Sequence, residues 1–182
     1  MARLQAAGNL DAEVVEAYQQ HSAGLFRYAV VIVHNRESAQ DAVQEIFLRY
    51  FVVRSQGQTI QNCKAWLFRV LRNHLLDSLK SASTKNEIGM EHAGQSVDAA
   101  QDPELTYHHT ELARRIWSTL APRELECLRL RNEGFCYEEI AEILSVRTGT
   151  VGALLTRAQK KIRKILDHPA PALAGRLVDN PC

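Results

Sequence analysis

Basic, amide and aromatic side chains alternate along residues 64–79, and this combination has the chemistry of nucleic-acid binding. Its polar members are Lys64, Arg69, Arg72 and Asn73, and its aromatic members are Trp66 and Phe68. Cations neutralise backbone phosphates, whereas flat side chains hold a base that has left its stack. For Trp66 we favour a different interpretation, an anchor in the core of a helix bundle.

A helix-turn-helix pattern follows in residues 137–166. Small Ala141 and a set of apolar residues have the spacing of two crossing helices, namely Ile140, Leu144, Val146, Val151 and Leu154. The second of these helices would lie in a major groove with its first turns against base edges. Cations continue along it: Arg157, Lys160, Lys161, Arg163 and Lys164.

Patterns for catalysis or metal binding do not occur in this sequence. It has no glycine-rich phosphate loop, no HExxH motif and no nucleophile elbow. Neither Cys127 with Cys136 nor His108 with His109 has a standard zinc-ligand spacing. We therefore predict a protein that is not an enzyme and that binds no metal or cofactor.

Composition indicates a globular chain of the cytoplasm. Of the 182 residues, 46% are apolar and 24% charged, as in ordinary folded domains. The longest apolar run, residues 28–33, is too short for a membrane span of about 20 residues, and residues 1–11 lack the apolar core of a secretory signal. Four cysteines without a CxxC pair are typical of reduced thiols. We expect no membrane contact by the chain itself.

Apolar periodicity predicts helices throughout the first half. One helix begins near Asp11. A second has Ser38 and Asp41 spaced as a capping box, and Asn62 caps a third. The apolar stripe expected in the second helix is Ala39, Ala42, Val43, Ile46, Phe47 and Tyr50, and in the third it is Trp66, Leu67, Val70, Leu71 and Leu79.

The second half is predicted to be helical as well. Asp102, Pro103 and Glu104 have the signals of a helix start, and a later helix begins at Pro122 and ends at Gly134. We predict an all-α fold of two small helical domains, residues 11–80 and 105–168. A flexible linker over residues 81–104 joins them, and residues 169–182 form a mobile tail.

Charge is unevenly distributed along the chain, although the net charge is only +1. Residues 1–80 carry nine Lys or Arg against seven Asp or Glu, and residues 105–168 carry eleven against eight. Between them, residues 81–104 carry one against five. An acidic linker therefore separates two mildly basic domains.

Three motifs in order resemble the extracytoplasmic-function (ECF) subfamily of bacterial RNA polymerase sigma factors. SAQDAVQEIFLRYF, residues 38–51, is similar to the family's helix that docks on the clamp of core polymerase. KAWLFRVLRNHLLDSL, residues 64–79, is similar to its promoter-melting helix, and residues 120–163 are similar to its domain for the minus-thirty-five element. The resemblance implies a sigma factor that binds core RNA polymerase and directs promoter-specific initiation.

The resemblance also implies which residues make each contact. The residues implied to bind core polymerase are Asp41, Gln44, Glu45 and Leu48. Those implied to contact minus-ten DNA are Asn62, Lys64, Trp66, Arg69, Arg72 and Asn73. Those implied to contact minus-thirty-five DNA are Arg147, Thr148, Thr150, Arg157 and Lys160. The implied partners are core RNA polymerase, promoter DNA and an anti-sigma factor. The acidic linker either threads basic channels of the polymerase or is a solvated spacer.

The recognition helix departs from the family pattern. The family commonly places a lysine, a serine and an arginine after its Gly-Thr-Val triplet, whereas this chain has Gly152, Ala153 and Leu154. Small residues here either let the helix backbone approach DNA closely or form a face for a protein partner. Ser145 also replaces the usual turn glycine, and Cys136 the usual Ser or Thr cap.

A second function from another class is an autonomous helix-turn-helix regulator with an N-terminal protein-interaction module. A helix-turn-helix alone is compatible with it, because such spacings occur in many regulators. Residues 38–51 and 64–79 favour the sigma factor, since an ordinary repressor needs neither a clamp-binding nor a melting surface.

Overall fold

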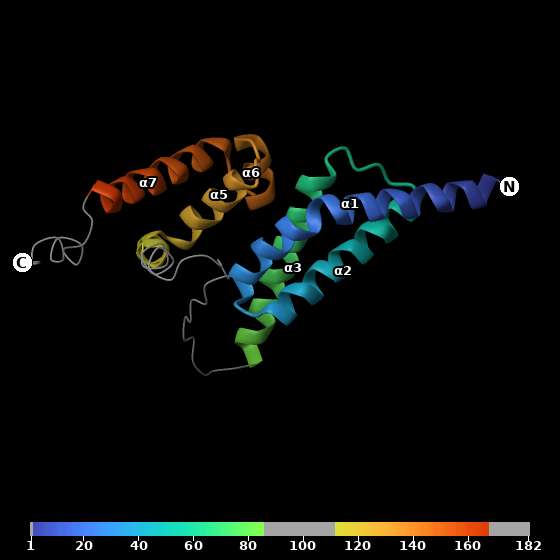
Figure 1. Ribbon diagram of the computed structural model, residues 1–182, viewed down its shortest axis with the longest axis horizontal. Coiled ribbons are helices and arrows are strands. Elements are labelled where there is room, and N and C mark those ends of the chain that lie inside the picture. Colours follow the sequence, from blue (N-terminus) through green and yellow to red (C-terminus); the bar gives the residue numbers. More distant parts are fainter. Residues whose placement is uncertain (1, 86–111, 168–182) are drawn as a thin grey trace, which may run out of the picture.

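The computed structural model describes residues 2–85 and 112–167, and every element in these ranges is an α-helix. In chain order they are α1 (Ala2–Val33), α2 (Arg36–Ser55), α3 (Cys63–Lys85), α5 (Pro122–Asn132), α6 (Tyr137–Leu144) and α7 (Thr148–Asp167). Residues 112–119 are helical too. Helices α1–α3 form what we term the N-terminal half, and residues 112–167 the C-terminal half (Figure 1). The all-α prediction is confirmed.

The N-terminal half is a three-helix bundle in which α1 packs along α2 and both pack on α3 (Figure 1). Leu25 of α1, Ile46 of α2 and Leu67 and Leu71 of α3 are completely buried between them. All six residues of the stripe predicted for the second helix are buried. A helix with one apolar face buries that face against its neighbours, which is why the periodicity alone located this core.

Several predicted details of this half are wrong. Helix α1 begins at Ala2 instead of near Asp11, because the residues before Asp11 are mostly good helix formers. Asn35, and not a Ser38–Asp41 box, caps α2: its side chain accepts a 2.8 Å hydrogen bond from the backbone N–H of Ser38. The Asn35 cap satisfies one of the orphan N–H groups of the first turn, so the helix starts before Ser38.

The predictions for α3 are confirmed at its start and wrong near its end. Asn62 caps the helix, since its Oδ1 accepts a 3.0 Å hydrogen bond from the backbone N–H of Ala65. Leu79 is 41% exposed and lies outside the core. The last turns of α3 extend beyond the α1–α2 connection, and no other helix of the described residues packs on them there (Figure 1). The same helix continues to Lys85, into the segment predicted as linker.

The C-terminal half is built around the helix-turn-helix of α6 and α7. Pro122 opens α5 and Gly134 follows it with a φ of 89°, as the sequence predicted. Buried residues shared by α5, α6 and α7 include Cys127, Leu130, Ile143 and Leu155. Burial raises the pKa of the Cys127 thiol to about 11, so this cysteine acts as a small apolar filler. The predicted helix start at residues 102–104, residues 86–104 of the linker and the tail lie outside the described residues.

The turn between α6 and α7 carries a strained residue. Ser145 has φ 54° and ψ 49°, the left-handed conformation that glycine adopts most easily. The backbone N–H of Val146 donates a 2.9 Å hydrogen bond to the carbonyl of Ala141 and closes the turn. The turn therefore forms although a serine, and not a glycine, occupies this position.

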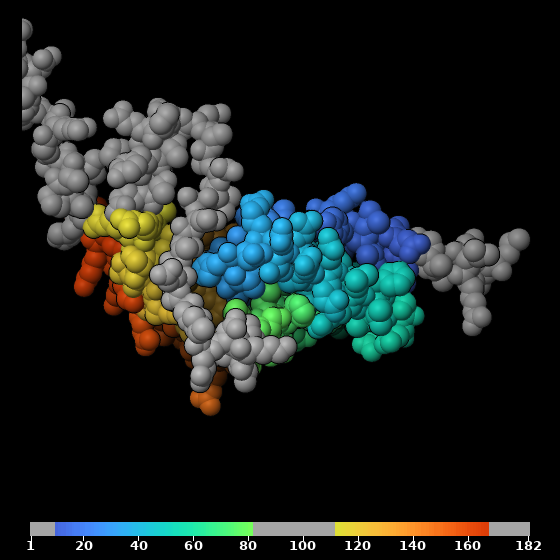
Figure 2. Space-filling view, turned by 90° about the horizontal axis from the view of Figure 1, so that it is seen from below, coloured from blue at the N-terminus to red at the C-terminus, as the bar shows by residue number. Residues whose placement is uncertain are grey.

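The two halves lie against each other and share a continuous apolar cluster. Figure 2 shows the blue-to-green surface of α1–α3 beside the yellow-to-red surface of the C-terminal half. Helix α6 packs on α3, and Phe135, between α5 and α6, packs edge-on against Phe68 of α3 at 5.0 Å between ring centroids. In the described ranges, no helix is long and apolar enough to cross a membrane.

Candidate nucleic-acid interface

The residues predicted to bind polymerase form one strip along the solvent side of α2. Asp41, Gln44 and Leu48 are exposed, Leu48 by 63%, and Glu45 is half-buried. Glu45 accepts a 2.7 Å hydrogen bond from Arg49 one turn later. The strip thus offers carboxylates, an amide and an apolar side chain on a single rigid helix.

A hollow beside this strip was not predicted from the sequence. It has a volume of about 290 Å³, lies between α1 and α2, and is lined in part by Tyr18, Phe26 and Gln44. Tyr18 is 47% exposed and its ring lies 4.9 Å from that of Phe47. The packing of α1 on α2 thus leaves about half of the Tyr18 surface open to solvent.

The five polar residues among the six predicted minus-ten residues fall into two groups. Arg69 and Asn73 are exposed, whereas Asn62, Lys64 and Arg72 bond to the C-terminal half. Trp66 is half-buried against the core, and its ring lies 5.8 Å from that of Tyr50. Arg69 and Asn73 are thus open to solvent, whereas the other three polar side chains are hydrogen-bonded to the C-terminal half.

Arg72 is buried at the junction of the halves. Only 6% of its surface is exposed, and its Nε donates a 2.6 Å hydrogen bond to Oε1 of Glu126 on α5. The hydroxyl of Tyr28 on α1 donates a 3.0 Å hydrogen bond to the same oxygen. Burial first, and the Glu126 charge second, raise the pKa of Tyr28 well above its usual value. This carboxylate therefore joins three helices.

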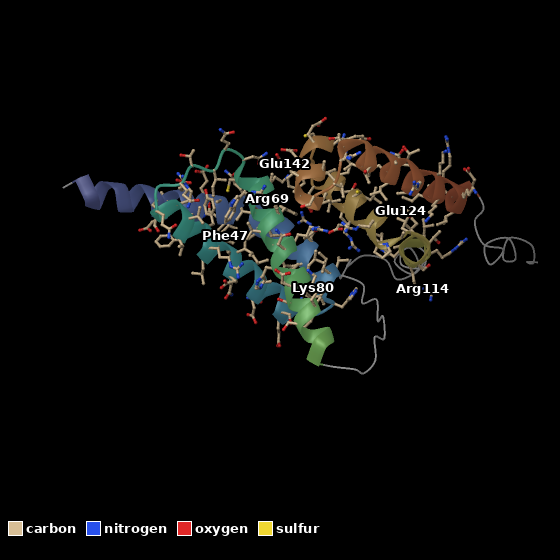
Figure 3. The ribbon with its side chains drawn as sticks, turned by 180° about the vertical axis from the view of Figure 1, so that it is seen from behind. Phe47, Arg69, Lys80, Arg114, Glu124 and Glu142 are labelled. Atoms are coloured by element: carbon tan, nitrogen blue, oxygen red, sulfur yellow. The ribbon has the colours of Figure 1, made fainter. Side chains whose placement is uncertain are left out.

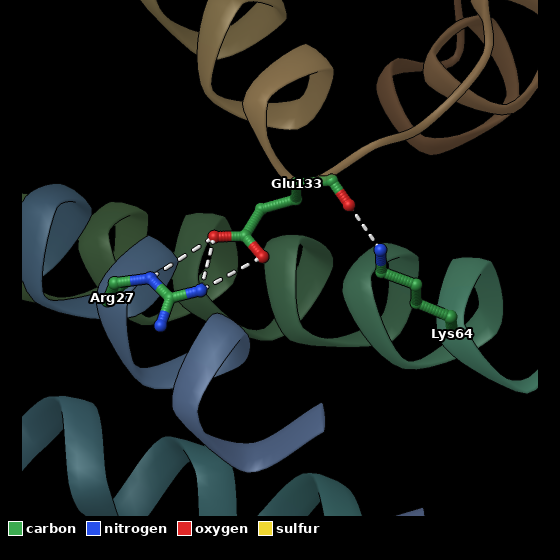
Figure 4. Close-up of polar contacts among 3 residues, drawn as sticks. All are labelled: Arg27, Lys64 and Glu133. Atoms are coloured by element: carbon green, nitrogen blue, oxygen red, sulfur yellow. Dashed lines mark hydrogen bonds and ion pairs between the residues drawn. The ribbon is translucent and has the colours of Figure 1, made fainter. Parts of the chain in front are cut away.

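Glu133, directly after α5, reaches across to both α1 and α3 (Figure 4). Its carboxylate accepts hydrogen bonds from Arg27 at 2.9 and 3.2 Å, and its backbone carbonyl accepts one from Lys64. The Lys64 ammonium also lies 4.6 Å from the centroid of the Phe135 ring. A side chain at Gly24 would begin 2.7 Å from the Glu133 carboxylate, so this close approach depends on glycine.

Glu139 of α6 makes the third contact. Its Oε1 accepts a 2.6 Å hydrogen bond from the Asn62 amide, while Oε2 accepts a 2.7 Å bond from the backbone N–H of Cys136. The hydrogen bond from Cys136 is the main reason why the pKa of Glu139 is lowered. Glu139 therefore both caps α6 and anchors it on the start of α3.

The residues predicted to contact minus-thirty-five DNA all lie exposed on or just before α7: Arg147, Thr148, Thr150, Arg157 and Lys160. A side chain at Gly149 would meet nothing, and one at Gly152 would only touch Tyr137 at 3.8 Å. Packing within the chain therefore does not require glycine at either position. Gly149, Gly152 and Ala153 of the first turns of α7 form a patch of small residues that we term the smooth surface, and polar side chains lie around it.

Lys161 has a structural role that the sequence did not reveal. It donates a 2.7 Å hydrogen bond to Glu124, whose side chain is almost fully buried on the side of α5 that faces α7 (Figure 3). Lys161 also donates to the carbonyl of Thr119 at 3.3 Å. Glu124 in turn accepts a 2.9 Å hydrogen bond from the backbone N–H of Ala121 and so caps α5. Lys161 therefore holds α7 on α5, although part of its side chain remains exposed.

Among the described residues, no cluster of three His, Cys, Asp or Glu has the geometry to hold a metal ion. His108, His109 and Cys182 lie outside these residues.

In a comparison with known proteins, each half of the chain matches a family model. The Sigma-70 region 2 model matches residues 17–84, and the Sigma-70, region 4 model matches residues 110–162. The ECF RNA polymerase sigma factor SigL of Mycobacterium tuberculosis is 29% identical over 172 residues, 92% of this chain and 97% of SigL. The chain belongs to the extracytoplasmic-function sigma factors. SigE of Mycolicibacterium smegmatis, also an ECF sigma factor, is 31% identical over 161 residues, 83% of this chain and 60% of SigE.

Solved structures share the fold of this sigma factor. The sigma factor RpoE from Bartonella quintana, crystallised with the anti-sigma factor NepR, has a TM-score of 0.65 and 20% identity, covering 89% of this chain and 99% of RpoE. CnrH, in complex with the cytosolic domain of CnrY, has a TM-score of 0.60 and 20% identity, covering 92% and 96%.

As a sigma factor the chain directs promoter-specific initiation and is not itself an enzyme. The region 2 match contains the strip on α2 and the polar residues of α3, and the region 4 match contains the helix-turn-helix. The family prediction made from the three sequence motifs is confirmed.

Proposed function

We propose that this sigma factor binds the clamp of core RNA polymerase through Asp41, Gln44, Glu45 and Leu48. The observation that carries the proposal is their arrangement: they share the solvent side of α2, while the stripe behind them is buried. Polar and acidic groups around an exposed leucine suit a basic protein surface with an apolar centre. A rigid helix also keeps these groups in register before binding.

We further propose that α3 holds the opened minus-ten element and that α7 reads the minus-thirty-five element. Exposed Arg69 and Asn73 supply a cation and an amide for the DNA backbone and bases. On α7, Arg147, Thr148 and Thr150 lie at the N-terminal end of a recognition helix, from which base edges are read. Arg157 and Lys160, about two or more turns later, neutralise phosphates.

Domain boundaries, partners and location complete the proposal. Residues 11–80 and 105–168 act as the two functional domains, residues 81–104 as the linker, and the protein works in the cytoplasm. An anti-sigma factor is the expected regulator, because RpoE and CnrH were each solved with a protein partner. Their similarity supports this assignment at the level of the fold.

The test is open-complex formation with purified core polymerase on duplex DNA randomised at both promoter elements. We expect the D41A/Q44A variant to lose polymerase binding and opening while keeping its helicity. The matched control is E16A/Q20A, which removes one acid and one amide from the exposed face of α1 in the same bundle. Equal polymerase affinity of D41A/Q44A and the native chain would overturn the α2 assignment. DNA binding without any polymerase binding would instead favour the autonomous regulator.

A further inference from the structure

A cluster of polar side chains holds the α2–α3 loop, residues 56–62, and Glu13 of α1 lies at its centre. The Oε1 atom of Glu13 accepts a 2.7 Å hydrogen bond from the Tyr50 hydroxyl and another of 2.7 Å from Nε of Arg54. Its Oε2 atom accepts a 2.9 Å bond from Nη2 of Arg54. The third guanidinium nitrogen, Nη1, donates to the backbone carbonyl of Gln58 in the loop. One guanidinium therefore connects α1 with the α2–α3 loop.

The Arg54–Glu13 pair is fixed in one geometry. Two parallel hydrogen bonds from a planar guanidinium leave a carboxylate little freedom. The hydrogen bond from Arg54 first, and that from Tyr50 second, lower the pKa of Glu13 below its ordinary value of 4.5, so the carboxylate is ionised at neutral pH. Burial is the main reason why the pKa of Tyr50 is raised, so its hydroxyl keeps its proton and donates. Because the Tyr50 ring is buried in the bundle, the pair is anchored on the core.

Gln58 is the point at which the middle of the loop is fastened to the bundle. Its backbone N–H donates a 3.3 Å hydrogen bond to the carbonyl of Val53, and its own carbonyl accepts the bond from Arg54. Later in the loop, Ile60 packs partly on the core and Asn62 caps α3. Arg54 thus decides where the exposed part of the loop, before Ile60, lies.

The chemistry of the loop suits bases better than phosphates. Residues 56–62 include no charged side chain. Four exposed polar residues follow one another closely: Gln56, Gln58, Thr59 and Gln61. An amide both donates and accepts hydrogen bonds, as the edges of bases require, whereas phosphates attract cations. These amides come directly before α3 and its proposed minus-ten residues.

We propose that Arg54, oriented by Glu13, is a positioning residue for minus-ten recognition: it holds the backbone of the α2–α3 loop so that the loop's amides meet the bases beside α3. The proposal rests on the proposed role of α3. Arg54 needs no DNA contact of its own, because Glu13 and the loop already occupy its guanidinium. A loop that is ordered in advance does not pay for its ordering on binding, so its amides can discriminate between bases.

Three variants separate the parts of the cluster. R54A removes the contact to the loop, and R54K keeps the positive charge without the planar fork that reaches both partners. E13Q keeps the size of the side chain and removes its charge. The matched controls are R36A, at the exposed start of the same helix, and E16Q, one turn further along α1, where Glu16 accepts a hydrogen bond from Gln20. Circular dichroism and thermal melting check the fold, and R54K and E13Q carry the comparison if R54A does not fold.

The experiment measures promoter opening by the full-length chain with core polymerase. Duplex DNA randomised at both promoter elements is first enriched for the sequences that the native holoenzyme opens. Opening rates are then measured on the enriched DNA and on two derivatives, one scrambled at the minus-ten element and one at the minus-thirty-five element. The ratio of the enriched rate to each scrambled rate gives the preference at that element.

We expect R54A to lower the minus-ten preference by about tenfold, the size of one lost base contact. The minus-thirty-five preference and the affinity for polymerase should stay native, as should both preferences in R36A and E16Q. R54K and E13Q should lower the minus-ten preference by less than R54A. E13Q should add no further loss in the R54A background, because Glu13 acts through Arg54.

A merely structural role of Arg54 would slow opening on all three DNAs in equal proportion and leave both preferences unchanged. That result, or an equal loss of both preferences, overturns the positioning role. A further loss on adding E13Q to R54A overturns the orientation by Glu13. If the native holoenzyme has a minus-ten preference that R54A and R54K retain, the proposed function stands and the positioning role is wrong. If the native holoenzyme opens no DNA or has no minus-ten preference, the proposed function of α3 fails and the positioning role fails with it.

Discussion

Arg72 of α3 and Glu126 of α5 form a 2.6 Å ion pair buried between the two halves. The pair joins a residue of the predicted promoter-melting helix to the half that we propose reads the minus-thirty-five element. A buried pair of this kind is costly to break from one side, because the remaining charge is left without a partner. The exposure of Arg72 on α3 therefore depends on where the C-terminal half lies.

Exposed Arg69 and Asn73 should carry DNA contacts that do not depend on how the C-terminal half packs on α3. We expect R69A to reduce promoter opening by the holoenzyme by about tenfold, since a lost charged contact costs on the order of 1.5 kcal/mol. R69K should retain most of the activity, because the cation is kept. The measurement is the rate of open-complex formation at several salt concentrations. Native rates for R69A would show that this face does not meet DNA.

Ser145 should limit the stability of the helix-turn-helix. Its left-handed conformation costs roughly 1 kcal/mol for a residue with a Cβ atom, and glycine avoids most of that cost. We expect S145G to raise the melting temperature of the C-terminal half in calorimetry. S145A, which keeps the Cβ atom, is the control and should give no increase. A lower melting temperature for S145G would contradict the assignment of strain to this turn.

The Lys161–Glu124 pair predicts that the C-terminal half loses stability in acid. The hydrogen bond from Lys161 is the main cause that lowers the pKa of Glu124 below its ordinary value of 4.5. A carboxyl whose pKa is lower in the folded state stabilises the fold above pH 4.5, and this contribution disappears as the pH falls through the folded-state pKa.

We expect the difference in unfolding free energy between the native chain and E124Q to be largest near neutral pH and to shrink below pH 4.5. Chemical denaturation monitored over the C-terminal half from neutral pH into acid measures it. A difference that stays constant across this range would show that the ionised carboxylate does not stabilise the fold.

Gly152 distinguishes the two interpretations of the smooth surface on α7. A side chain at this position has room in the free protein, and replacing glycine inside a helix contributes about 0.5 to 1 kcal/mol of stability. If the α7 backbone approaches DNA closely, G152K weakens promoter binding although the fold becomes more stable. Stronger or unchanged binding by G152K would argue for a face that serves a protein partner. Promoter affinity and the melting temperature, measured together, separate these outcomes.

Local patterns in the sequence determined the helices and the family. The apolar stripe from Ala39 to Tyr50 located the core face of α2, and the cap at Asn62 and the breaks at Pro122 and Gly134 located helix ends. These features depend on residues within a few turns of one another, which is the range over which helical spacing carries information. The start of α2 was misplaced because Asn35 and Ser38 are both good caps, and the sequence does not rank them.

Only the tertiary structure decided which basic side chains are exposed and so available to bind DNA. Arg69 and Arg72 lie one turn apart and look equivalent in the sequence, but one is exposed and the other is buried against Glu126. In the sequence Lys161 is likewise one more cation along the second helix of the helix-turn-helix, but in the structure it is paired with Glu124. Ion pairs between residues 37 to 106 positions apart depend on how helices pack, and no local spacing encodes that. The sequence by itself determined the family and the helices of this sigma factor, whereas the packing of its halves decided which of its surfaces are free to act.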